Sequence, residues 1–341
     1  MPMRVSLRAV ILMVVWSLAT TAAGQVITEF PLPTALSFPT TIAAGPDGNL
    51  WFTQQGNNRI GRITPAGSIT EFSRPSPFGS RGITAGLDGN LWFTGGDMIG
   101  RITPAGVVTE FPIPTVNAFP WGIAAGPDGN LWFVENSGNK VGRITPAGVM
   151  TEFPIPTANA RPLGITAGPD GNVWFTESFK VGRITPAGTI TEFPVSGNPW
   201  GITTGPDGNV WFADIAGRIG RITPTGTLTE FALSTDAAGI ATGADGNLWF
   251  TERSASRIGR ITPTGTITEF PIPTPSSAPY LIAAGPDGKL WFTEFIGNKI
   301  GTITTGVIPA PATPAVPTLS LLVCVILTAV LAGLGTVVLK R

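Results

Sequence analysis

The sequence contains no histidine, one cysteine and one tyrosine, and its 21 basic residues balance its 21 acidic residues. Without histidine, the chain lacks the side chain that titrates near neutral pH without tuning and that most often serves as a general base. The balanced charge and the absence of a basic stripe argue against a nucleic-acid partner. The cysteine, Cys324, lies in an apolar segment near the C-terminus, so we expect no disulfide elsewhere.

Glycine and proline are abundant, with 44 and 33 copies. Such an excess can indicate disorder, but here both residues recur in register with apolar runs. The stretch Gly-Pro-Asp-Gly-Asn-Leu-Trp-Phe at residues 126–133 has a near copy in each of seven units. A period of about 40 residues indicates a repeat architecture. The tryptophans that mark the units, which we expect to be core residues, are Trp51, Trp92, Trp132, Trp174, Trp211, Trp249 and Trp291.

Each unit contains four short apolar runs separated by turn residues, as at 122–125, 130–134, 141–145 and 149–153. Four antiparallel strands in about 40 residues form one propeller blade. The second run is apolar on both faces, which indicates a strand covered on both sides, as in stacked blades. The sequence therefore predicts an all-β fold, a seven-bladed β-propeller of four-stranded antiparallel blades over residues 25–306.

The order of the runs at the two ends of the repeat region predicts how the ring closes. Residues 27–30 have the pattern of a fourth strand, and residues 300–304 have the pattern of a third strand. We expect these two segments to pair, because closure removes two exposed strand edges that would favour aggregation. The closed propeller is expected to be a monomer.

The two ends of the chain predict export and envelope sorting. Residues 1–24 combine a basic start, a short apolar run and small residues, the pattern of a signal peptide for the Sec pathway. Residues 307–318 form a Pro/Ala-rich linker, and residues 319–341 contain an uncharged run long enough to cross a bilayer as a helix, followed by Lys340 and Arg341. This orientation leaves the propeller outside the cytoplasm. Residues 316–320 resemble the Pro-Thr-Leu-type sorting signals of Gram-negative bacteria, which implies a sorting protease of the envelope as a partner.

The repeat motifs themselves carry a second resemblance. Gly-Pro-Asp-Gly-Asn-Leu-Trp-Phe-Thr-Glu, Ile-Gly-Arg-Ile-Thr-Pro-x-Gly and Thr-Glu-Phe-Pro-Ile-Pro-Thr together resemble virginiamycin B lyases, also called streptogramin B lyases, over about residues 26–306. The resemblance implies a seven-bladed propeller and a Mg²⁺-dependent elimination that opens a cyclic depsipeptide antibiotic. It also implies a histidine base in a Pro-His-Gly-Ile segment and, fourteen residues later, a glutamate that assists metal and substrate binding.

This chain departs from that pattern at the histidine position. The corresponding positions hold Arg81, Trp121, Leu163, Trp200, Ala238 and Tyr280, with Thr40 or Thr41 in the first unit. The acidic positions are better kept, as Glu135, Glu177, Asp214, Glu252 and Glu294, with Gln54 and Gly95 in the first two units. By the resemblance, Glu252 and Glu294 are candidates for holding Mg²⁺.

The positions where near-identical repeats differ are the candidate binding face. Aromatic side chains with a polar tip suit binding surfaces, although the same residues could only plug the channel mouth. Phe179 and Phe295 are further candidates. The candidate residues of this face are Arg81, Trp121, Glu135, Glu177, Trp200, Asp214, Glu252, Tyr280 and Glu294.

Three functions remain open from the sequence. The first is binding of a peptide, glycan, small cyclic ligand or protein at this face. The second is a divergent streptogramin B lyase that uses another base, such as a glutamate whose pKa is raised by burial. The third is a scaffold in the envelope whose partner uses the blade rims.

Overall fold

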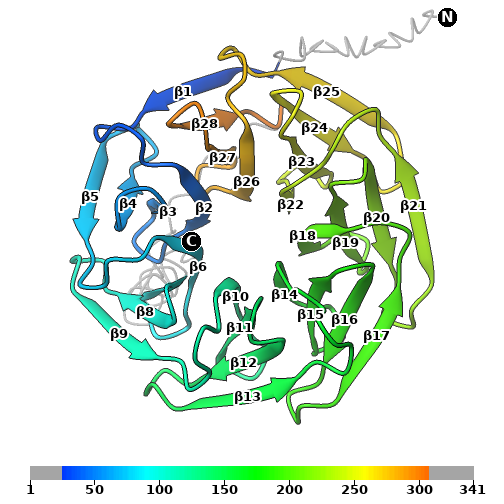
Figure 1. Ribbon diagram of the computed structural model, residues 1–341. Coiled ribbons are helices and arrows are strands. Elements are labelled where there is room, and N and C mark those ends of the chain that lie inside the picture. The colour runs from blue at the N-terminus through cyan, green and yellow to red at the C-terminus, as the bar shows by residue number, and fades with distance from the viewer. Residues whose placement is uncertain (1–24, 307–341) are drawn as a thin grey trace, which may run out of the picture. The chain divides into compact units, whose positions relative to one another are not determined.

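The computed structural model describes residues 25–306, which form seven four-stranded antiparallel sheets arranged around a central axis (Figure 1). The all-β, seven-bladed fold is thus confirmed. The predicted signal peptide, linker, transmembrane helix and sorting signal lie outside the described residues. Within residues 25–306 no helix has the length and apolar character needed to cross a membrane.

The strands follow one another from the axis outward in each blade, apart from the strand that closes the ring. The blades are β2 (Pro39–Ala44), β3 (Leu50–Gln54), β4 (Arg59–Ile63), β5 (Ile69–Ser73); β6 (Ser80–Ala85), β7 (Leu91–Gly95), β8 (Met98–Ile102), β9 (Val108–Pro112); β10 (Pro120–Ala125), β11 (Leu131–Glu135), β12 (Lys140–Ile144), β13 (Met150–Pro154); β14 (Ile165–Ala167), β15 (Val173–Glu177), β16 (Lys180–Ile184), β17 (Ile190–Pro194); β18 (Pro199–Thr204), β19 (Val210–Asp214), β20 (Arg218–Ile222), β21 (Leu228–Ala232); β22 (Ile240–Thr242), β23 (Leu248–Glu252), β24 (Arg257–Ile261), β25 (Ile267–Pro271); and β26 (Pro279–Ala284), β27 (Leu290–Glu294), β28 (Lys299–Ile303), β1 (Ile27–Pro31).

The repeat tryptophans are core residues, as predicted, and each is fully buried. In blade 3, the ring of Trp132 stacks on Phe153 of the outer strand with 5.6 Å between centroids. The guanidinium of Arg143 lies 5.4 Å from the Trp132 ring and donates to the carbonyl of Pro186 in the next blade. This arginine therefore joins two blades while it covers an aromatic pair.

The Asp-Gly turn supports the same core. Asp128 accepts a hydrogen bond of 2.9 Å from Nε1 of Trp132, which satisfies the one polar atom of that buried ring. Gly129 has a φ of 80°, the left-handed conformation that glycine adopts most readily. The interpretation of these aspartates as turn formers is confirmed, and they also hold the tryptophans.

Ring closure follows the prediction. β1 pairs antiparallel with β28, in a register that runs from Ile27 opposite Ile303 to Pro31 opposite Lys299. Lys299 also forms an ion pair of 3.2 Å with Glu29. The N-terminal strand thus completes the seventh blade and leaves no open sheet edge at the closure (Figure 1).

An irregularity in the innermost strand aims side chains at the axis. In five blades the pairing between first and second strands shifts register, as between Pro120 and Ile123 in β10. The skipped residues include Arg81, Trp121, Trp200 and Tyr280. A bulge of this kind redirects a side chain that regular alternation would place on a blade face.

Candidate functional site

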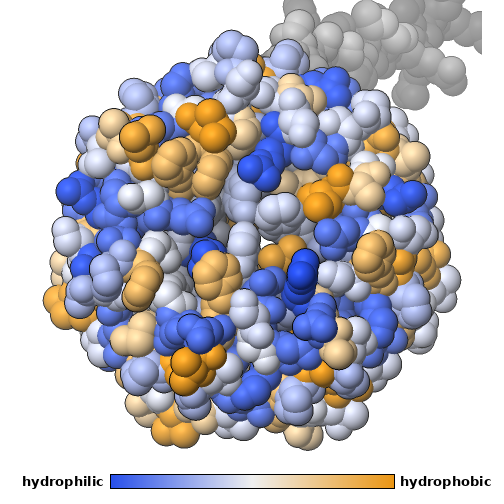
Figure 2. All heavy atoms as spheres, viewed as in Figure 1, coloured by the Kyte–Doolittle hydropathy of each residue, from blue (hydrophilic) through white to orange (hydrophobic). Residues whose placement is uncertain are grey.

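The first strands enclose an axial cavity of about 150 Å³. Its wall contains one isoleucine from each of several blades, such as Ile123, Ile165 and Ile282, together with the glycine that follows each bulged residue. These glycines permit a close approach between inner strands, since a Cβ on Gly122 would lie 2.6 Å from the carbonyl oxygen of Leu163. Figure 2 shows the hollow at the centre of one face, with hydrophobic residues around it in small separate groups.

Aromatic rings meet over this cavity. The rings of Trp121 and Trp200 lie edge to face with centroids 6.0 Å apart, and Trp200 and Tyr280 do so at 5.4 Å. These residues come from blades 3, 5 and 7, which are not neighbours, so their contacts cross the axis. Tyr280 also stacks on Phe295, whose ring lies 5.1 Å from that of Phe38. We call these five residues the aromatic mouth.

Two arginines lie against the mouth. The Arg81 guanidinium is 3.7 Å from the Phe119 ring centroid and 5.2 Å from that of Trp121. Arg253 lies over Tyr280 and Phe295 at 5.5 and 5.9 Å. Among residues 25–306, Nε of Arg81 and Nε1 of Trp121 are buried and have no hydrogen-bond partner. The mouth therefore offers hydrogen-bond donors and positive charge.

The phenol of Tyr280 is nearly buried, with 6% of the side chain's residue surface exposed. Burial raises its pKa above the ordinary value, against the opposing charges of Arg253 and Arg81. The hydroxyl consequently stays protonated at neutral pH and can act as one more donor.

The structure separates the predicted face into two sets. Arg81, Trp121, Trp200 and Tyr280 line the axial cavity, whereas none of the five predicted acids does so. Phe295 joins the aromatic mouth, while Phe179 is 63% exposed and lies outside the cavity lining. The acids are all fully buried at the ends of second strands: Glu135, Glu177, Asp214, Glu252 and Glu294.

Each buried glutamate sits beside a glutamate of the outermost strand. In blade 3, Glu135 lies opposite Lys140 in the strand register, and Lys140 forms an ion pair of 2.6 Å with Glu152. Both carboxyl oxygens of Glu135 lack a hydrogen-bond partner among the described residues. Burial, with the charge of Glu152 adding to it, raises the pKa of Glu135 to about 7.

The same arrangement recurs in blades 4, 6 and 7. Burial and a neighbouring outer-strand glutamate raise the pKa of Glu177 and of Glu294 to about 8. Burial also raises the pKa of Glu252 to about 7, although Arg257 donates a hydrogen bond of 2.6 Å to this carboxylate. Asp214 differs, because one of its oxygens accepts the backbone N–H groups of Asn198 and Ala216.

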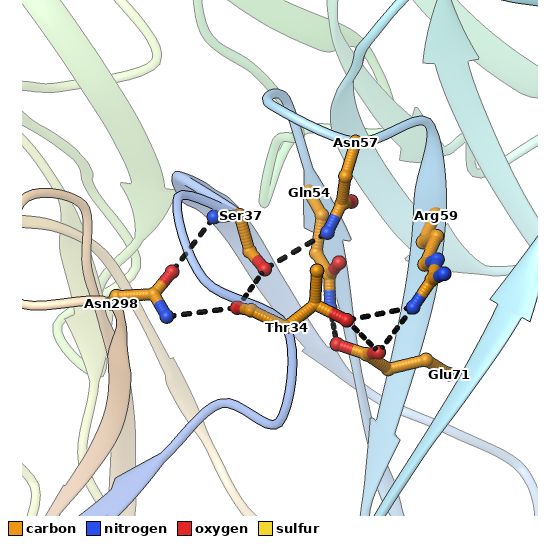
Figure 3. A network of polar contacts seen from close by, with 7 residues as sticks. All are labelled: Thr34, Ser37, Gln54, Asn57, Arg59, Glu71 and Asn298. Atoms are coloured by element: carbon orange, nitrogen blue, oxygen red, sulfur yellow. Dashed lines mark hydrogen bonds and ion pairs between the residues drawn. The ribbon is translucent and has the colours of Figure 1, made fainter.

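Blade 1 replaces the buried acid by an amide (Figure 3). Gln54 donates from Nε2 to Glu71 at 2.9 Å, and Glu71 also accepts from Thr34 and Arg59, each at 2.7 Å. Asn298, from the last blade, donates to the carbonyl of Thr34 at 2.9 Å. This network joins the first and last blades next to the ring closure (Figure 3).

Blade 2 replaces the whole arrangement. Gly95 stands at the acidic position, and Met98 stands where blade 3 has Lys140. Arg74 enters from the preceding loop and pairs with Glu110 at 2.9 Å, with its own side chain fully buried. The arginine also donates to the carbonyl of Phe78 and to Ser80 at 2.7 and 2.8 Å.

One set of positioning residues was missed by the sequence analysis. The threonine that follows Trp-Phe ties the bulge of its own blade to the bulge of the next. Thr176 accepts from the backbone N–H of Gly164 and donates to the carbonyl of Trp200, both at 2.8 Å. Thr251 likewise donates to the carbonyl of Tyr280 at 2.7 Å. The signal was present, because threonine recurs at this position of the repeat.

The residues do not form a set suited to Mg²⁺. Within residues 25–306 no three or more acidic or cysteine side chains gather as metal ligands do. Glu294 and Glu252, the sequence candidates, lie beside the cations Lys299 and Arg257. Magnesium needs several oxygen ligands in near-octahedral geometry and usually keeps waters. We therefore derive no step through a metal ion.

Comparison with known proteins agrees with the repeat motifs. The sequence model of the virginiamycin B lyase family matches residues 16–238 and 179–314. A streptogramin B lyase structure is 36% identical, with a TM-score of 0.77, and the alignment covers 82% of this chain and 97% of that chain. The selenomethionine-substituted virginiamycin B lyase of Staphylococcus aureus is 39% identical, with a TM-score of 0.78 and coverage of 82% and 99%. A catalytically inactive histidine-to-alanine variant of the S. aureus enzyme, solved with quinupristin, is 38% identical, with the same TM-score of 0.78 and the same coverage of 82% and 99%.

Proposed function

This chain belongs to the virginiamycin B lyase family, and we propose that it binds a ligand at the aromatic mouth without the histidine-dependent elimination that the resemblance implies. The observation that carries the proposal is the content of the bulged positions. The chain has no histidine, and Trp121, Trp200 and Tyr280 meet over the axial cavity instead. Trp and Tyr supply rigid apolar area at small entropic cost, which suits binding.

The ligand is a peptide, a glycan or a small cyclic molecule with acceptor groups. Flat ring faces at the mouth favour apolar side chains or sugar rings, and the unsatisfied donors favour carbonyl or anionic oxygens. Since a related enzyme was solved with quinupristin, this cyclic peptide is the natural first probe. The features of residues 1–24 and 307–341 support display in the cell envelope, with the propeller outside the cytoplasm.

Catalysis with another base is the alternative. The pKa values of Glu177 and Glu294, both raised to about 8, are in the range that general-base catalysis requires. Both side chains are fully buried and absent from the lining of the axial cavity. A base must reach the proton that it removes, and this placement favours binding over elimination.

Calorimetry with quinupristin, followed by mass spectrometry of the mixture with and without Mg²⁺, tests the proposal. We expect binding of the intact ring, and at least tenfold weaker binding in Trp121→Ala and Trp200→Ala. Phe179→Ala, at an exposed aromatic outside the cavity lining, serves as the matched control and should bind normally. Unchanged affinity in both tryptophan variants would refute the site, and ring opening would establish the lyase alternative.

A further inference from the structure

A second hollow, which we call the outer groove, adjoins the axial cavity. It has a volume of about 430 Å³ and is lined by loop residues of blades 1 to 3, including Phe78, Gly96, Asp97 and Phe119. Arg81 lines both the outer groove and the axial cavity. A ligand at the mouth could therefore extend into the groove past this arginine.

The groove exists because blade 2 departs from the repeat. The turn between β7 and β8 contains two residues, Gly96 and Asp97, whereas the turn between β11 and β12 contains four. Gly96 follows the acidic position, where blades 3, 6 and 7 carry Asn136, Arg253 and Phe295. A Cβ on Gly96 would lie only 3.1 Å from Cβ of Phe78. The short turn and the missing side chain together leave the space open.

The charge in the groove comes from Arg81. Arg74, seven residues earlier, is matched by Glu110, but no ion pair joins Arg81 to a carboxylate within residues 25–306. The carboxylate of Asp97 is committed elsewhere, because its two oxygens accept the backbone N–H groups of Asn117 and Phe119 at 3.1 and 3.2 Å. Arg81 is thus a half-buried cation with an unused donor.

The walls of the groove are aromatic and accessible. Phe78 is 64% exposed and Phe119 is 42% exposed. Phe119 already covers one face of the guanidinium, which fixes the plane of Arg81 and leaves its N–H edge for an acceptor. A planar fork of donors matches a carboxylate best, and the phenylalanines suit a ring next to it.

We propose that the outer groove binds a small carboxylate joined to an aromatic ring, with Arg81 holding the carboxylate and Phe78 and Phe119 contacting the ring. The inference rests on the proposed function, since it names the class of ligand group that enters from the mouth. It assigns Arg81 as the residue that determines specificity for anionic ligands.

The test uses purified full-length protein and two matched probes, N-acetyl-phenylalanine and its neutral amide, titrated by calorimetry or NMR. We expect the carboxylate to bind at least tenfold more tightly than the amide at low salt, with the preference reduced by salt screening. Arg81→Gln should abolish the preference. Arg161→Gln removes the same charge from an exposed position outside both cavity linings and should leave it intact.

Gly96→Asn adds a steric arm to the test. Asparagine tolerates the φ of 62° at this position, so the variant should fold while its side chain fills the groove. We expect it to weaken both probes and to leave quinupristin binding at the mouth unchanged. Equal binding of the two probes, no binding of either, or an unaltered preference in Arg81→Gln would overturn the outer-groove assignment. The mouth is judged separately by the Trp121 and Trp200 variants, so either proposal can fail alone.

Discussion

The side-chain amide of Gln54 donates a hydrogen bond of 2.9 Å to Glu71, at the position where four other blades bury a glutamate beside an outer-strand glutamate. Gln54 shows how a neutral donor satisfies this site. A protonated Glu135 has the same shape and can donate to Glu152 in the same way. The buried glutamates are therefore neutral core residues at or below neutral pH, and their deprotonation places a second negative charge between packed blades.

Stability should consequently fall as the pH rises through neutrality. The pKa of Glu294 is about 8 in the folded chain against an ordinary value of 4.5. Its contribution is fully present below pH 4.5 and is lost as the pH rises from there through about 8. The outer glutamates, such as Glu29, have lowered pKa values and act in the opposite sense, at more acid pH. Glu294→Gln should therefore raise the melting temperature at pH 8.5 by a few degrees and change it little at pH 5.

Blade 1 supplies the matched control for that measurement. Gln54→Glu should create a buried acid next to Glu71 and add the same loss of stability between pH 5 and 8.5. Melting curves of both variants across this range decide the matter. If Glu294→Gln and the unmodified protein show parallel profiles, the buried glutamate does not titrate as the geometry requires.

A second prediction concerns the glycine of the third strand. A Cβ on Gly142 would lie 2.1 Å from the ring of Phe133, which is fully buried and cannot move away. Gly142→Ala should therefore cost roughly 2 kcal/mol or more of unfolding free energy, from overpacking. Gly129→Ala is the control, because nothing lies within 4 Å of its Cβ and only the φ of 80° opposes it. We expect that variant to cost about 1 kcal/mol. Urea unfolding compares the two, and an equal cost would contradict the packing argument.

The fold could be predicted from the sequence because local signals agree at every repeat. Turn residues recur at fixed spacing, and Leu131 to Val134 is apolar on both strand faces, which only stacked sheets can bury. Ring closure followed from the order of strand types, since residues 27–30 had no other partner in the pattern.

The site could be predicted only in part, for reasons of side-chain direction. Pro120 and Glu135 are opposite each other in the pairing of β10 and β11, so the predicted acid does lie near the predicted aromatic residue in the backbone. However, Glu135 shares the strand face of Phe133, inside the blade packing, because side chains alternate along a strand. Trp121 points to the axis because of a bulge, and no residue type announces that shift of register.

The outer groove was invisible to the sequence analysis for a related reason. Gly96 drew no attention because glycine is frequent throughout the chain. Its effect appears only when the loop that carries Phe78 is placed beside the shortened turn. Contacts between neighbouring blades, rather than the pattern within one unit, create the space.

A third prediction tests the substituted network of blade 2. Arg74 is buried and pairs with Glu110, whose charge would be left without its partner if the arginine were removed. Arg74→Met should cost about 3–5 kcal/mol of stability. Adding Glu110→Gln removes the stranded charge and should recover much of the loss. A double-mutant cycle by chemical denaturation measures the coupling, and strictly additive losses would show that the pair is not energetically linked.

The last prediction concerns the strand that closes the ring. Phe30 of β1 stacks on Trp291 with 5.7 Å between centroids, and the strand covers the whole length of β28. Deleting residues 25–31 exposes that edge and the Trp291 ring, so we expect a large fall in melting temperature and association of chains through the free edge. Thr28→Ala is the control, since this exposed residue can change without altering the pairing of the strand. Size-exclusion chromatography with light scattering reports the association. A monomeric deletion variant with the original melting temperature would mean that β1 closes the ring without stabilising it, and that the six-bladed remainder and an incomplete seventh blade suffice to hold the propeller together.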